Sequence, residues 1–278
     1  MSALVKRNLK LFFRDKTSVF FSLLSVLIIL GLYILFLGDV TSNDIPIESA
    51  RTFVDIWMIA GIMAVSSLTS TLGALGVVVM DKESRRFLDF RVSPLSNRKL
   101  MLSYLFSAII VGVLMSVIVF IVASLYLYLS EGLVFELLIN IKILCVILLA
   151  VSSSASLIFF FISFISSQNA YSTVSIVIGT VVGFLPGIYV PIRALPSFVQ
   201  LLIKIFPVSH SALLFKQIML KETLNEIPAQ VVHELEQTFG VVYTLGDTTL
   251  NMTHSIVYLL VCCILFGMLT VWSLSRKK

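Results

Sequence analysis

The sequence predicts an all-α integral membrane protein with six transmembrane helices, an amphipathic helix before them and two short helices between them. Of the 278 residues, 58% are hydrophobic and only 13% are charged, whereas a soluble domain carries about 25% charged residues. The apolar residues also form long blocks and not periodic stripes. A hydrocarbon core about 30 Å thick needs roughly 20 apolar residues per helix. The blocks therefore predict spans near residues 19–38, 53–80, 100–129, 143–165, 170–190 and 254–274.

The positions of Lys and Arg predict the orientation of the chain. Fourteen of the 20 basic residues lie in three segments, which are residues 1–18, the loop 81–99 and the C-terminus. Six spans place these segments on one face, and the positive-inside rule makes that face the cytoplasm. The net charge of +5 then follows from topology, so no nucleic-acid partner is expected.

The N-terminal residues 1–18 are predicted to form a helix that lies along the inner membrane surface. One side of this helix is apolar and the other is basic, and the apolar side carries Val5, Leu9, Phe12 and Phe13. A basic flank that only enforces orientation would explain the charge. It would not require an apolar face, which favours the membrane-surface helix.

The stretch DKESRRFLDFRVSP, which begins at Asp81, is the densest patch of charge in the chain. It predicts a short helix of about a dozen residues, roughly 18 Å long, which is too short to cross a bilayer. Asp81 is expected to cap its N-terminus and Ser93-Pro94 to end it. Phe87 and Phe90 form an apolar face that either the membrane surface or a cytoplasmic partner protein would cover.

Four prolines predict a further short helix after the fifth span, and they are Pro186, Pro191, Pro196 and Pro207. Pro196 occupies the favoured first position of a helix of about eleven residues, which covers half a bilayer. Because unpaired backbone in lipid is costly, this helix must be re-entrant and packed inside protein, or lie at the outer interface. Arg193 and Lys204 mark its ends. Residues 211–253 are expected to form a soluble extracellular cap or a lid, with a strand or turn at VVYTLGD.

Few side chains in the spans predict chemistry. Neither a disulfide framework nor a metal site is indicated by Cys145, Cys262 and Cys263. The histidines are expected outside the spans or at their rim, and they are His210, His233 and His254. An intramembrane hydrolase, which needs a base at the depth of its nucleophile, is therefore disfavoured. A proton-coupled carrier is also disfavoured, since Lys142 is the one charged candidate and is expected to reach the interface.

The order of these parts resembles the transmembrane subunit of an ABC exporter of the type-2 permease class, over essentially the whole chain. That class has a basic elbow helix, six spans, a coupling helix between spans two and three, and a re-entrant helix after span five. Its coupling loop contains Glu, Gly-Thr-Leu and Pro. Glu83, Phe87 and Pro94 match the Glu, Leu and Pro positions, whereas Arg85-Arg86 replaces Gly-Thr. The stretch GIYVPIRALP is similar to the outlet pattern, and Phe206-Pro207 follows where Asn-Pro is usual.

The resemblance implies roles for the residues already singled out. The interface with an ATPase would comprise Glu83, Arg85, Arg86, Phe87 and Phe90. The elbow helix would use its apolar side, and the re-entrant gate would comprise Pro191, Pro196, Phe198 and Pro207. ATP and Mg would be bound by a separate cytoplasmic ATPase dimer, and a second permease copy, identical or closely related, would complete the complex in the lipid. Ser152, Ser153 and Ser156 are candidates for the lining of a pathway, although helix packing would also explain them.

The function expected from this resemblance is ATP-driven export of a hydrophobic or amphipathic compound across the cytoplasmic membrane of a bacterium, as in multidrug efflux. The substrate would be a drug, a toxin, a peptide or a lipid-like molecule. No Gly-Lys dipeptide occurs in the chain, so the phosphate-binding loop with its Lys is absent. No enzyme activity, cofactor or metal is expected of this chain. The alternatives are a polysaccharide or lipid exporter permease and a non-transporting channel or scaffold.

Overall fold

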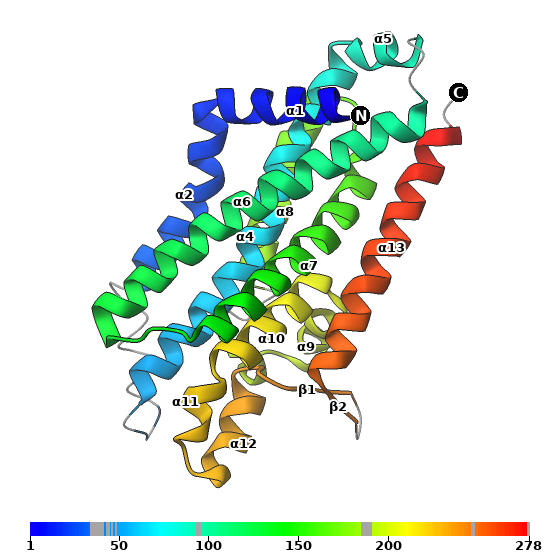
Figure 1. The fold of residues 1–278 in the computed structure, drawn as a ribbon. Helices are drawn as coiled ribbons and strands as arrows, with labels where there is room; N and C mark the ends of the chain where they lie inside the picture. Colours follow the sequence, from blue (N-terminus) through cyan, green and yellow to red (C-terminus); the bar gives the residue numbers. More distant parts are fainter. Residues whose placement is uncertain are drawn as a thin grey trace.

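The chain forms a bundle of long helices with a two-stranded hairpin at one end (Figure 1). The computed structural model describes residues 1–33, 42, 45, 47, 49–92, 96–184, 191–245 and 248–276. The helices of the first part are α1 (Ser2–Arg14), α2 (Lys16–Leu32), α4 (Ala50–Glu83), α5 (Arg86–Val92), α6 (Asn97–Glu131), α7 (Leu137–Ile162) and α8 (Gln168–Phe184). The second part comprises η2 (Ile192–Ala194), α9 (Ser197–Ile205), α10 (Pro207–Met219), α11 (Lys221–Asn225), α12 (Ala229–Thr238), β1 (Tyr243–Leu245), β2 (Thr248–Leu250) and α13 (Met252–Arg276).

The described helices confirm an all-α membrane protein. Four of them are long and apolar enough to cross a bilayer, namely α4, α6, α7 and the part of α13 from Met252 to Ser273. Helices α9 and α10 pass the same test as a pair bent by 85°, which gives up to five spans within the described residues. Helices α2 and α8 have 17 residues each, and the spans predicted there continue into 34–40 and 185–190, outside the described residues. The count of six spans stays a prediction.

Helix α4 is the centre of the bundle and contacts α2, α6, α7, α8 and α10. Most of its side chains are buried on all sides, as expected for a helix surrounded by other helices. Helices α4, α6 and α7 approach one another closely at Gly112. A Cβ there would lie 2.7 Å from Thr71 Cγ2 and 2.7 Å from Val151 Cγ1. The absence of a side chain at this position therefore lets the three helices meet.

The two ends of the bundle carry different elements. Helices α1 and α5 and the last turns of α13 lie at one end, here called the α5 end (Figure 1). Helices α11 and α12 and the antiparallel pair β1–β2 lie at the other, here called the hairpin end. The hairpin begins in the stretch VVYTLGD, where the sequence allowed a strand or a turn, and Tyr243 pairs with Leu250.

The proline-rich segment differs from its predicted form. Pro196 is the residue that precedes α9 and not its first residue, and Pro191 precedes η2 in the same way. Pro207 takes the first position of α10 instead, where its missing N–H has no cost. Phe198 on α9 is 68% exposed. Helix α9 lies between Pro196 and Pro207, where a short helix was predicted, and a bend of 85° separates it from α10. Its re-entrant placement stays a prediction.

The expectation that residues 211–253 form a soluble cap is wrong for its first part. Helix α10 contacts α4, α7 and α13, and nearly all its side chains from Pro207 to Met219 are buried. Its apolar residues Leu213, Leu214 and Phe215 are fully enclosed. Burial of such side chains stabilises the fold by about 1.5–3 kcal/mol each, which explains why this segment enters the bundle.

Two titratable side chains that were expected near water are buried by α10. His210 is 3% exposed, with Nδ1 3.1 Å from Ser255 Oγ and Nε2 2.9 Å from the Lys204 carbonyl oxygen. Lys216 is 1% exposed, and its Nζ donates to the Phe239 carbonyl at 3.0 Å. The prediction of no buried histidine is therefore wrong. Lys142, the predicted charged candidate within a span, is exposed.

Candidate functional site

The last turn of α4 carries three consecutive charged residues, Asp81, Lys82 and Glu83, and each of them binds a different part of the fold. Asp81 binds α1 and α6, Lys82 binds the end of α7, and Glu83 binds the start of α8. Helix α5 follows directly. We call this three-residue segment the α4 junction.

Asp81 lies at the centre of a buried polar cluster and is fully enclosed. Its two carboxylate oxygens accept hydrogen bonds from Arg7 Nη1 and Nη2, each at 2.7 Å, and the Tyr104 hydroxyl donates to Oδ2 at 2.7 Å. Hydrogen bonding to Asp81 raises the pKa of Arg7 above its ordinary value, so the guanidinium stays charged. The prediction that Asp81 caps a new helix is wrong, because α4 continues through it to Glu83.

Lys82 and Glu83 attach the turn between α7 and α8 to α4. Lys82 Nζ donates to the carbonyl oxygens of Ile162, Ser163 and Ile165 at 3.1, 3.0 and 3.0 Å. These carbonyls lie at and beyond the end of α7, where no helical N–H is available to them. Glu83 Oε1 accepts from the backbone N–H of Gln168, the first residue of α8, at 3.2 Å. Glu83, which was predicted to face an ATPase, therefore also has a partner within the chain.

Arg85 connects the α4 junction to α5 and adopts a left-handed backbone conformation, with φ of 59°. For a residue with a side chain this conformation costs roughly 1–2 kcal/mol. The Arg85 N–H donates to the Lys82 carbonyl at 3.2 Å, and the Leu88 N–H donates to the Arg85 carbonyl at 2.8 Å. The left-handed residue Arg85 therefore joins α4 to α5 and sets the direction of α5.

The predicted docking residues on α5 do not share one environment. Phe87 and Phe90 are half-buried and pack against the core of the same chain, and the Arg7 guanidinium lies 5.1 Å from the centre of the Phe90 ring. Leu88 is 54% exposed, and Arg86 is also exposed. Leu88 is thus the large apolar side chain that is exposed among residues 86–90 of α5.

The four elbow residues also separate in the structure. Phe12 is buried, Val5 and Leu9 are half-buried, and Phe13 is 40% exposed. Figure 1 shows α1 crossing the α5 end and turning into α2. The buried edge of α1 is completed by Asn8, whose Nδ2 donates to Ser107 Oγ of α6 at 3.3 Å. Helix α1 is therefore attached to the bundle by polar contacts as well as by its apolar side.

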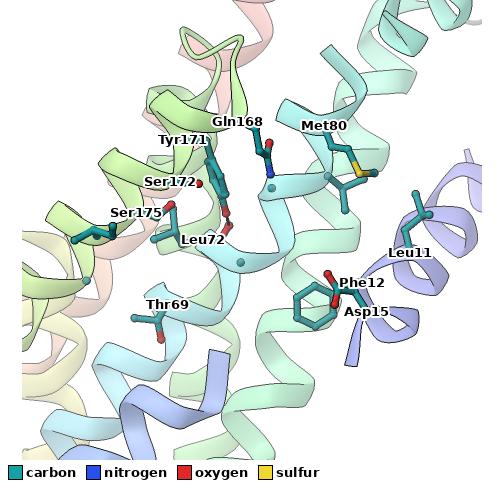
Figure 2. A pocket seen from close by; sticks show the side chains of 15 residues that line it. Leu11, Phe12, Asp15, Thr69, Leu72, Met80, Gln168, Tyr171, Ser172 and Ser175 are labelled. Carbon is teal, nitrogen blue, oxygen red and sulfur yellow. Dashed lines mark hydrogen bonds between the residues drawn. The ribbon is translucent and has the colours of Figure 1, made fainter. Parts of the chain in front are cut away.

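A cavity of about 790 Å³ lies between α1, α4 and α8. Figure 2 shows Gln168 and Tyr171 of α8 on one side of it and Phe12 and Asp15 on the other. The Tyr171 hydroxyl donates to the Leu72 carbonyl at 2.6 Å, which fixes this side chain against α4. The volume is within the range of about 300–1,000 Å³ for small-molecule sites. Its lining combines apolar side chains with a few polar groups, which suits an amphipathic molecule.

The three serines predicted to line a pathway lie on α7 and outside this cavity. Ser153 and Ser156 are each 1% exposed, and Ser156 Oγ lies 3.5 Å from Cys263 Sγ of α13. Ser152 Oγ donates to the Leu148 carbonyl at 2.7 Å. Their burial places Ser153 and Ser156 in helix packing within a single chain.

Residues 39–272 match the family model described as ABC-2 family transporter protein. The chain belongs to the ABC-2 transporter family. No individually curated protein matches the sequence. The match confirms the family that the order of helices indicated, and it makes the chain a membrane component of an ABC transporter that associates with an ATPase subunit. The ABC-2 match includes the whole α4 junction and begins after α1, so the ion pair of Arg7 with Asp81 joins the matched region to a helix before it.

Sequence reasoning missed Lys82 as a junction residue and Tyr104 as a partner of the junction, and it gave Asp81 the wrong role. A carboxylate at the end of a membrane span could have indicated an ion pair, since buried charges near membranes are usually paired. The partner is not visible in the local sequence, because Arg7 lies 74 residues away. The three acceptors of Lys82 are backbone carbonyls, which every residue has, so the sequence does not indicate them.

Proposed function

We propose that the protein is the permease subunit of an ATP-driven exporter for a hydrophobic or amphipathic compound. A separate ATPase chain would bind ATP and Mg, dock on α5 and supply the energy, and this chain would have no hydrolytic activity. The α5 end would face the cytoplasm of a bacterial cell. Fourteen of the 20 basic residues in three segments support this orientation.

The observation that carries the proposal is the attachment of α5 to the α4 junction. Helix α5 lies at the end of the bundle (Figure 1), and Asp81, Lys82 and Glu83 connect its base to α1, α6, α7 and α8. A force applied to α5 would therefore reach several helices at once. A loop that only rests on the membrane would need no such connections.

The cavity between α1, α4 and α8 supports an amphipathic substrate and a second permease copy. The exposed residues of α8 include the small or polar Asn169, Ser172, Thr173, Gly179 and Thr180, together with Ile176 and Val177 at 70% and 57% exposure. A mixed surface of this kind suits contact with protein, because its polar groups would be unfavourable against lipid tails. A second copy facing α8 would cover these residues and enclose the pathway.

Docking on α5 is tested with a cytoplasmic ABC ATPase that co-purifies with this chain. Truncation of an interface anchor commonly costs about 2 kcal/mol or more, which is roughly thirtyfold in affinity. Leu88→Ala should therefore weaken binding of the ATPase strongly, and Phe87→Ala should uncouple transport while the spans stay folded. Leu129→Ala, which removes a 74% exposed leucine near the other end of α6, is the matched control.

Two results would contradict the proposal. The first is vanadate-sensitive ATP hydrolysis by this chain purified alone. The second is normal transport by both α5 variants together with a failure of cysteines at positions 86–88 to crosslink to the ATPase.

The substrate cavity is tested by filling it. A Cβ added at Gly179, which lines the cavity, meets no atom within 4 Å, so Gly179→Leu should fold normally and reduce transport. Gly31 has the same open surroundings on α2 and does not line the cavity. Gly31→Leu should therefore transport normally, and equal effects of the two variants would remove the cavity from the pathway.

A further inference from the structure

A second, smaller cavity at the hairpin end is lined by basic and amide side chains. It has a volume of about 100 Å³ and lies between η2, α9, α12 and β1. One water occupies roughly 30 Å³ in the liquid, so this cavity has room for a phosphate-sized group. Its polar side chains are Arg193, Gln200, Lys204 and Gln237. None of the described residues that line it is acidic.

The donors of this cavity are held in place by the backbone around them. Lys204 Nζ donates to the Thr244 carbonyl of β1 at 2.7 Å, which leaves the ammonium two further N–H donors. Gln200 Nε2 donates to the Leu195 carbonyl at 2.8 Å. Arg193 lies on η2, is exposed, and brings a guanidinium to the same rim. Two cations and two amides around one small space suit an oxyanion.

Helix α9 joins this cavity to an apolar surface. Phe198, Leu201, Leu202 and Ile205 are each 47–68% exposed, whereas Gln200 and Lys204 on the same helix reach the cavity. A helix with one exposed apolar side and one cationic edge is typical of a bilayer interface.

The contact between α9 and α13 places this helix near the membrane boundary. The Tyr258 hydroxyl donates to the Ile205 carbonyl at the end of α9. Tyr258 lies six residues into α13, which is roughly 9 Å along the helix axis. Val257 and Val261 lie at the same level, at 53% and 55% exposure, in a candidate membrane span that runs from Met252 to Ser273. The end of α9 is therefore within about two turns of the start of that span.

We propose that the cavity of Arg193 and Lys204 binds the phosphate of an anionic phospholipid, whose acyl chains lie along the exposed apolar side of α9. The charge of the cavity selects the phosphate, and the apolar side chains beside it select a lipid over a free anion. This site is separate from the 790 Å³ cavity between α1, α4 and α8. It does not depend on which compound is exported.

The test uses the full chain in detergent and native mass spectrometry with added phosphatidylglycerol or phosphatidylcholine of the same acyl chains. Wild type should retain phosphatidylglycerol in preference to phosphatidylcholine. Arg193→Gln and Lys204→Gln should each lower phosphatidylglycerol binding by about tenfold, since each removes a charged donor. They should lower phosphatidylcholine binding less, because its choline cation is repelled by the same two side chains. Arg193→Gln keeps the proposal testable if loss of the Lys204 contact with Thr244 disturbs the fold.

The control variant is Lys142→Gln, which removes an exposed charge from the first turns of α7 outside the cavity, and it should bind both lipids like wild type. A second arm uses the double variant Phe198→Ser with Leu202→Ser, which should weaken the binding of both lipids equally. The proposal is overturned if Lys142→Gln and Arg193→Gln have equal effects, because the preference would then be general surface charge. It is also overturned if inorganic phosphate displaces the lipid at equal concentration, or if a cysteine at position 201 crosslinks two copies of the chain.

Discussion

Helices α4 and α6 are joined near each end by a hydrogen bond from a tyrosine to a buried aspartate, and the two ends use their arginines differently. At the α5 end, Tyr104 donates to Asp81 at 2.7 Å, and Arg7 of α1 adds two hydrogen bonds. At the hairpin end, Tyr126 donates to Asp55 at 3.0 Å. Its arginine, Arg51, lies one turn earlier on α4 itself, with Nε 3.2 Å from Oδ1.

The two arginines are matched in exposure, at 28% and 29%, and both aspartates are fully buried. The difference is therefore which helix the guanidinium comes from. Arg51 brings its guanidinium to Asp55 from the same helix, whereas Arg7 fastens α1 to α4. The same three residue types thus stabilise a helix pair at one end and assemble three helices at the other.

The largest effect that this comparison predicts is that of Arg7→Ala. Removing one partner of a buried ion pair leaves an uncompensated charge, and the free energy of unfolding should fall by about 3 kcal/mol. The measurement is unfolding of the detergent-solubilised chain by SDS. Because the pKa of Arg7 is raised, Arg7 contributes fully to the free energy of unfolding at any pH below the ordinary arginine pKa. The loss of stability in Arg7→Ala should therefore be the same at about pH 6 and about pH 9.

The control for this loss is the double variant Arg7→Ala with Asp81→Asn, which removes the buried charge as well. It should recover part of the stability, since the interaction energy of neighbouring residues is measured by such a cycle. A double variant as unstable as Arg7→Ala would show that the ion pair is not the origin of the loss.

Arg51→Ala should have a smaller effect, about 1 kcal/mol in the same unfolding assay. The guanidinium comes from the same helix as the aspartate, and pairs at this spacing contribute little beyond charge compensation. Tyr126 also continues to donate to Asp55. Equal losses of stability in Arg51→Ala and Arg7→Ala would mean that the attachment of α1 to α4 adds nothing to the free energy of unfolding.

Tyr104→Phe and Tyr126→Phe should each cost about 1 kcal/mol, the usual contribution of one hydrogen bond to a buried group. The two tyrosines lie near opposite ends of α6 and share no partner, so their costs should add in the double variant. A double-variant loss far above the sum would show that the two ends of the α4–α6 pair are energetically coupled.

The smallest expected effect is that of Arg85→Gly, a gain of about 0.5 kcal/mol. Glycine removes the steric cost of the left-handed conformation but loses more backbone entropy on folding. Arg86→Gly, at the first residue of α5, is the control and should lose stability instead, because its backbone is helical and glycine loses more backbone entropy on folding. A loss of stability in Arg85→Gly would mean that the Arg85 side chain makes a stabilising contact.

The long helices could be predicted from the sequence because lipid imposes a local requirement on composition. The spans predicted at 53–80, 100–129 and 254–274 fall within α4, α6 and α13, and each real helix extends past its apolar block. The extensions contain Asp81 and Glu83 at one end of α4 and Arg51 at the other. Charged residues at these places were assigned to loops, although helical backbone continued through them.

The pairing of the charged groups could not be predicted, because it depends on residues far apart in the chain. Asp81 has the sequence signature of a cap when only its neighbours are considered, and its partner in α1 decides otherwise. Lys216 and His210 were assigned to water since no apolar block of span length contains them. The 85° bend between α9 and α10 lets a short apolar helix enter the core, and hydropathy over a span-length window does not detect such a helix.

Lys82 and Glu83 also interact with the electrical polarity of the helices they touch. An α-helix carries a partial negative charge at its C-terminus and a partial positive charge at its N-terminus. Lys82 lies against the carbonyls that end α7, and Glu83 lies against the first N–H of α8. Two adjacent residues of α4 thus present opposite charges to the opposite poles of two consecutive helices. Their order is fixed by the direction of the chain, since the reversed order would set like charges together, and a displacement of this turn away from α4 would be opposed at both poles.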